Sequence, residues 1–203
     1  MGDLTLQHVV LRIGAVLLIA GVHGFSIAGM SCLLGDQGPR HDGRLGLGPW
    51  RHLDPIGGLL MVFFTFGWIR PIAVDPGSLR SGRVGLVAVV AGGSGATLLL
   101  AVLARMARPF LLGLLPDTAA ATLFIFIETL GQLCISFTLF NLLPLPPLTG
   151  QHLLVAALPA WREAVAQMRI YPAVVLMLLV ASGLAERLLA PAESIVARVV
   201  FGQ

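Results

Sequence analysis

The sequence predicts an all-α protein embedded in a membrane. Of its 203 residues, 57% are apolar and 11% are charged, and the mean hydropathy is +0.91. An ordinary soluble domain carries about 25% charged residues. A helical crossing takes about 20 residues, so the chain has room for about five to six transmembrane or re-entrant helical segments. We expect them to form a single membrane-embedded domain, 1–203.

Apolar runs separated by charged or Pro- and Gly-rich loops mark the spans. The runs that are long enough for a full crossing are 13–34, 84–104 and 119–143. The segment 56–68 is apolar and aromatic but short. We therefore expect it to be tilted, half-buried or re-entrant.

The C-terminal part is predicted in four pieces. A short helix covers 151–158 and stops at Pro159, which cannot continue it. An amphipathic helix at 161–171 is expected to lie at the interface, with its aromatic residues at headgroup level. The last span is 172–185, and the tail 186–203 alternates charged and aliphatic residues as a surface helix does.

The charge pattern indicates a membrane partner rather than a nucleic acid. The net charge of +3 comes from thirteen arginines against ten acidic residues, and the chain has no lysine. No basic cluster is dense enough for nucleic acid, so the arginines are expected to meet lipid headgroups. Exclusive use of arginine favours a bacterial protein, which would lie in the inner (cytoplasmic) membrane. The arginines flank alternate sides about equally, so they do not predict the orientation.

A proline-dense turn between two apolar runs is the most informative motif. It reads Asn141-Leu-Leu-Pro-Leu-Pro-Pro-Leu-Thr-Gly150. Irregular backbone at membrane depth is tolerated where protein or a water-filled cavity surrounds it, so such a break usually lines a site. The run resembles the signature of the site-2 protease family of intramembrane zinc metalloproteases, Asn-Leu-Leu-Pro-Ile-Pro-Pro-Leu-Asp-Gly.

The resemblance extends over several ordered motifs from about Val22 to Gly150. Leu34-Gly-Asp36 and the stretch from Gly43 to Gly57, which contains His52-Leu-Asp-Pro-Ile-Gly57, are similar to the family's Leu-Gly-Asp and His-Ile-Asp-Pro-Ile-Gly. Phe66-Gly-Trp-Ile-Arg-Pro-Ile-Ala-Val-Asp-Pro76 looks like Phe-Gly-Trp-Ala-Lys-Pro-Val-Pro-Val-Asn-Pro. The resemblance implies a site-2-protease-like core over about 13–158.

The family's catalytic set is incomplete in this sequence. Active members place His-Glu-x-x-His on the first helix, where two His bind zinc and the Glu activates a water. The resemblance puts that motif on His23, Gly24 and Ile27, so one ligand remains and the base is absent. The third ligand, an Asp in the family, is Thr149 here. The family's Ala-Gly-Pro-x-x-Asn motif corresponds to a stretch that ends at Ala96, so its Asn is also missing.

Two readings of the remaining polar residues stay open. A lone imidazole cannot hold zinc, but His23, His152 and Glu128 could form a substitute metal site. The alternative makes His23 a buried polar residue and His152 an interfacial residue at the turn. Glu128, in the middle of a span, would then be a protonated acid that is bonded to Gln132 or to another helix.

Small residues on the third long run predict a close helix contact. Ala88, Gly92 and Ala96 recur at small-xxx-small spacing. This pattern lets a second helix approach, either inside the fold or from a partner subunit.

The sequence therefore predicts a catalytically inactive relative of the site-2 proteases. Its expected role is a scaffold, accessory subunit or assembly factor of a larger membrane complex, with other integral membrane subunits as partners and without a cofactor. The alternative is an active intramembrane zinc metalloprotease with an atypical metal site. A small transporter or channel is a third class, which Glu128 alone supports.

Overall fold

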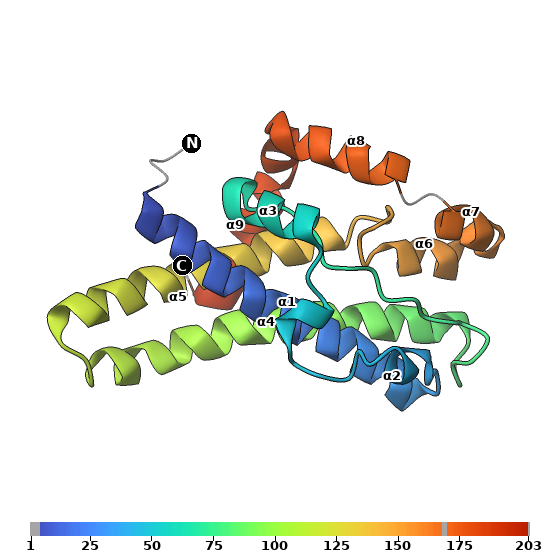
Figure 1. The fold of residues 1–203 in the computed structure, drawn as a ribbon, viewed down its shortest axis with the longest axis horizontal. Coiled ribbons are helices and arrows are strands. Elements are labelled where there is room, and N and C mark those ends of the chain that lie inside the picture. The colour runs from blue at the N-terminus through green and yellow to red at the C-terminus, as the bar shows by residue number, and fades with distance from the viewer. Residues whose placement is uncertain (1–4, 168–169, 203) are drawn as a thin grey trace.

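The structure is a computed structural model that describes residues 5–167 and 170–202, and its described part is built from helices (Figure 1). They are α1 (Leu6–Leu34), α2 (Gly38–His41), α3 (Pro55–Phe64), α4 (Arg83–Leu112), α5 (Asp117–Asn141), α6 (Gln151–Ala157), α7 (Arg162–Gln167), α8 (Ile170–Ala181) and α9 (Leu184–Phe201). Two short 3-10 turns, η1 (Pro49–Arg51) and η2 (Pro159–Trp161), lie between them. The predicted all-α membrane class is confirmed.

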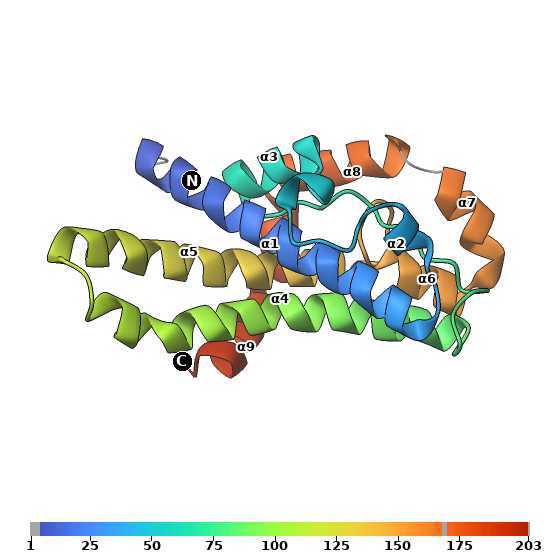
Figure 2. The same ribbon diagram turned by 60° about the horizontal axis from the view of Figure 1, so that its bottom comes forward.

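In the part of the chain that the structure describes, three helices are each long and apolar enough to cross a membrane: α1 with 29 residues, α4 with 30 and α5 with 25. Helices α4 and α5 run side by side as an antiparallel hairpin, and α1 crosses them at an angle (Figures 1 and 2). Ile19 of α1 and Leu133 and Phe137 of α5 belong to the largest buried cluster. The three predicted full spans thus correspond to the helices that form the core.

Segment 56–68 turns back on itself instead of crossing. The Asp54 carboxylate caps α3 by accepting from the backbone N–H of Ile56 at 3.0 Å and of Gly57 at 2.9 Å. The helix ends after ten residues at Thr65, which has a φ of 72°. Ten residues rise only about 15 Å, half of the hydrocarbon core. The chain then returns antiparallel beside Leu53.

The C-terminal part differs from its prediction. The segment 172–185 is not one helix: α8 has 12 residues and ends at Ala181, and α9 leaves it at 75°. Gly183 makes the bend with a φ of 74°, a left-handed conformation that glycine adopts without strain. The expected interfacial helix 161–171 is divided among η2, α7 and the start of α8, and its residues 168–169 lie outside the described residues.

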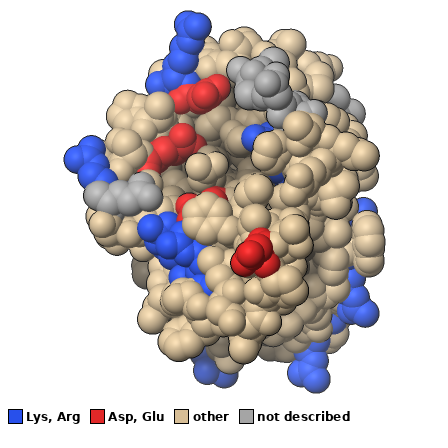
Figure 3. Space-filling view, turned by 90° about the vertical axis from the view of Figure 1, so that its left-hand side faces the viewer, with Lys and Arg blue, Asp and Glu red and all other residues tan. Residues whose placement is uncertain are grey.

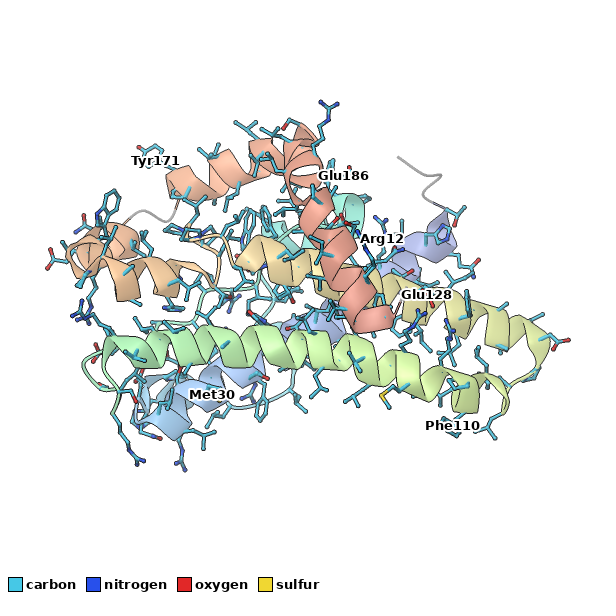
Figure 4. All side chains as sticks on the ribbon, turned by 180° about the vertical axis from the view of Figure 1, so that it is seen from behind. Arg12, Met30, Phe110, Glu128, Tyr171 and Glu186 are labelled. Carbon is cyan, nitrogen blue, oxygen red and sulfur yellow. The ribbon has the colours of Figure 1, made fainter. Side chains whose placement is uncertain are left out.

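The tail 186–203 was expected to be a surface helix, but its end packs on the core. Helix α9 passes over α5 on the side that faces the viewer in Figure 4 and ends beside α4. A methyl group added to Gly131 of α5 would lie 2.7 Å from the Phe201 ring. The ring therefore covers the glycine directly, and the tail holds the middle of α5.

Candidate functional site

His23 lies at the centre of the molecule with no exposed surface. Its Nδ1 is 3.1 Å from the Gly93 carbonyl oxygen and 2.9 Å from the Thr97 hydroxyl oxygen, both on α4. Its Nε2 is 2.9 Å from the hydroxyl oxygen of Thr149. Because a carbonyl oxygen can only accept, Nδ1 carries the proton and Nε2 accepts from Thr149. Both ring nitrogens are therefore engaged.

The proline turn holds Thr149 against His23. The Asn141 side-chain amide donates to the carbonyl oxygens of Gly67 and Phe137, each at 2.9 Å. The Gly150 N–H donates to the Asn141 carbonyl at 2.7 Å. A methyl group on Gly150 would lie 2.2 Å from a backbone oxygen, so only glycine fits this close approach. The turn that the sequence marked as a site does meet α1.

Gly24, the position of the family's general base, is covered by His52. A methyl group on Gly24 would lie 2.2 Å from His52 Nδ1 and 2.8 Å from its Cβ. His52 is fully buried, and its Nε2 is 2.9 Å from the Gly46 carbonyl oxygen. Burial lowers the pKa of His52, which keeps the ring neutral. An acidic side chain at position 24 has no room in this arrangement.

Ile27, the position of the second metal-binding His, is an apolar contact to α4. It is 2% exposed and belongs to a buried cluster with Ala28, Ile72 and Val89. A methyl group on Gly93 would lie 2.4 Å from the end of the Ile27 side chain. The isoleucine therefore fills the space between α1 and α4.

His152 is buried rather than interfacial, so that expectation is wrong. It is 7% exposed and, with apolar residues such as Ile27 and the polar residues Thr149 and Gln151, it lines a cavity of about 10 Å³, barely the size of one water. Burial lowers the pKa of His152 to about 4, against the opposing effect of a hydrogen bond with the Ile72 backbone. Residues from other segments cover His152, so the sequence of α6 alone does not show that this side chain is buried.

Glu128 is paired with two arginines of α4, so of the two partners expected from the sequence, Gln132 or another helix, the structure shows the second. Its Oε1 lies 3.2 Å from Nη1 of Arg105 and 2.5 Å from Nη1 of Arg108. Phe201 and Phe124 lie under the two guanidinium groups, with ring centroids at 4.9 and 5.1 Å. Figure 4 labels Glu128 near the end of α9, and Figure 3 looks at this end of the molecule. The antiparallel hairpin brings the end of α4 beside the carboxylate.

The three candidate ligands are not brought together. Glu128 meets arginines, and His23 meets Thr149. Among residues 5–167 and 170–202, no group of three or more His, Cys, Asp or Glu side chains is placed to hold a metal ion. Zinc in an open catalytic site takes three protein ligands, and the described side chains do not fit that requirement.

The small residues of α4 face α1 at one position at least. A methyl group on Gly92 would lie 2.5 Å from Met30 Cγ. Ala88 and Ala96 are half-buried on the same helix.

Two features of the site were not predicted from the sequence: the contact of Thr97 with His23, and the packing of His52 against Gly24. No local sequence pattern indicates either of them. Arg105 and Arg108, one turn apart on one helix face, did carry a signal for an acidic partner.

The fold and this buried polar centre define a helical integral membrane protein with a site between α1, α4 and the proline turn. The chain is similar to "Putative zinc metalloprotease YwhC" of Bacillus subtilis, with 33% identity over 178 residues, 84% of this chain and 80% of the relative. The chain belongs to the site-2 protease family. No family model matches it, and no solved structure matches it.

Proposed function

We propose that this protein is a catalytically inactive member of its family. It would act as a scaffold, accessory subunit or assembly factor of a larger complex in a bacterial inner membrane. The observation that carries the proposal is the hydrogen bond between Thr149 and His23 Nε2. It uses the imidazole lone pair that a metal would need.

The surroundings of this hydrogen bond support the same conclusion. A hydrolytic zinc site needs a base to activate water, and Gly24 supplies none. The space beside Gly24 is taken by His52, and Ile27 packs on α4. The positions that would serve only the metal and the water are thus filled by groups that pack or hydrogen-bond with each other.

Metal analysis tests the loss of the zinc site. Protein extracted without chelators should carry no stoichiometric zinc, and His23→Ala should leave the metal content unchanged. One zinc per chain that is lost in His23→Ala would overturn the proposal. Substitution of His152 and Glu128 would then identify the remaining ligands.

The accessory role needs a test of its own, namely extraction from native membranes in mild detergent followed by sizing. The expected result is co-migration with other integral membrane proteins. Association in lipid depends on close packing of small residues, and on α4 Ala88 and Ala96 remain half-buried beside Gly92, which Met30 of α1 covers. A sharp monomer peak without companions would count against a subunit role.

An active intramembrane zinc metalloprotease with an atypical site is the second candidate, and the printed name of the Bacillus subtilis relative favours it. It predicts chelator-sensitive cleavage of a membrane-spanning substrate by the purified protein.

A small transporter or channel rested on Glu128 alone. Its carboxylate is engaged by two arginines, so it does not favour that function.

A further inference from the structure

A groove of about 550 Å³ lies on the outer side of α1, away from the buried centre. Its walls include Phe25, Gly29 and Leu33 of α1, and Leu45 of the following loop. Gly92 of α4 lies behind Met30, which Figure 4 labels on this side of the molecule. The groove follows about 12 Å of the helix, by the rise from residue 25 to residue 33.

The groove has open space at its glycine and an apolar lining. A methyl group on Gly29 would have no atom within 4 Å. Phe25 is 38%, Leu33 73% and Leu45 38% exposed, so these side chains border the groove without filling it. Because α1 is a membrane span, an apolar groove along it faces lipid chains.

One end of the groove carries a cation. Arg40 of α2 is exposed there, just beyond the end of the span, and within the described residues its guanidinium makes no hydrogen bond or ion pair. The nearby arginines are occupied: Arg44 donates to the Arg51 carbonyl and Arg51 to the Gly43 carbonyl.

The charge around Arg40 is positive. Segment 37–51 has three arginines and one aspartate, a net charge of +2 with histidine neutral. The nearest acid in the preceding turn, Asp36, is buried and accepts from the N–H groups of Gly38 at 2.9 Å and Asp75 at 2.8 Å. Its oxygens are therefore directed at the backbone, and Arg40 is left to face the headgroup region.

We propose that this groove binds one anionic phospholipid, with an acyl chain along α1 and the phosphate at Arg40. An apolar channel that ends at an unpaired cation at the end of a span complements an anionic lipid. The inference does not depend on whether the buried centre is catalytic.

The groove contains its own reporter, Cys32. This thiol lines the groove, whereas Cys134 is fully buried. Phosphatidylglycerol added to the detergent-solubilised protein should slow maleimide modification of Cys32 and appear as a single bound lipid in native mass spectrometry. Phosphatidylcholine should slow the modification of Cys32 less and should give less of the lipid-bound species.

Two variants and two controls make the test specific. Arg40→Gln should weaken phosphatidylglycerol binding about five-fold and remove its advantage over phosphatidylcholine. Gly29→Leu should fill the groove and weaken both lipids. Arg80→Gln, an exposed arginine outside the groove, and Gly95→Leu, in open space on α4, should bind as the unaltered protein does.

Several outcomes would overturn the proposal. Equal binding of both lipids, or equal losses in Arg40→Gln and Arg80→Gln, would mean that arginines attract lipid without a site. Protection of Cys32 by a co-purified protein and not by lipid would make the groove a helix-docking surface instead.

Discussion

The hydroxyl of Thr149 donates a 2.9 Å hydrogen bond to Nε2 of His23, across 126 positions of the chain. It joins the proline turn to α1, while the other ring nitrogen holds α4. The bond thus fastens the two segments that the family resemblance assigns to metal binding. It is also open to direct test by substitution.

Thr149→Val should destabilise the protein by about 1–3 kcal/mol, because it leaves the buried His23 Nε2 without a donor. Thermal unfolding in detergent measures the loss. Thr149→Ser keeps the hydroxyl and is the matched control, which should lose much less. Equal melting temperatures of the two variants would show that the hydrogen bond contributes nothing.

Gly24→Ala should cost about 1–3 kcal/mol, because the added methyl group meets the His52 ring at 2.2 Å. Gly29→Ala, on the same helix in open space, should be neutral or stabilising by up to about 1 kcal/mol. If the contact is the cause, adding His52→Ala to Gly24→Ala should not add the full cost of the single His52→Ala variant. Simple additivity in this double-mutant cycle would contradict the close contact.

Glu128→Gln should lower stability on the order of 1–2 kcal/mol, because it removes the charge that faces Arg105 and Arg108. The side chains are only about 30% exposed, so solvent screens them in part. Glu163→Gln, on exposed α7, is the control and should have no effect. Unchanged stability in Glu128→Gln would instead support a neutral, structural acid at this position.

Acid should destabilise the protein through His152. Its pKa is lowered from 6.5 to about 4, so the folded state favours the neutral ring. The stability due to this group is complete above pH 6.5 and falls as the pH drops toward 4, by up to about 3 kcal/mol. Melting temperatures of the unaltered protein and of His152→Gln should converge over this range. The exposed His8→Gln should keep the full pH dependence.

The full spans could be predicted from sequence because each is a continuous apolar run. The cap at Asp54 and the end of α6 before Pro159 also follow from local chemistry. The bend at Gly183 could not be predicted from sequence, because a small residue inside an apolar run is equally compatible with a straight helix. Only the way α9 packs on Gly131 shows why the chain turns there.

For the candidate site the sequence named positions but not contacts. His23 and Thr149 were identified from the resemblance to the site-2 protease family, whereas their hydrogen bond depends on how three distant segments pack. For Glu128 the sequence left two partners open, Gln132 on its own helix or a group on another helix. Its arginines lie 20 and 23 positions away, and they reach it only through the register of the hairpin.

The bend between α8 and α9 decides on which face of the membrane the chain ends. Within residues 5–167 and 170–202, α1, α4 and α5 give three candidate crossings, and the bent pair gives a fourth if it counts as one span. Helix α8 alone rises only about 18 Å, too little to cross. A side-specific label at each terminus would therefore reveal whether Gly183 folds the chain back toward the face it came from.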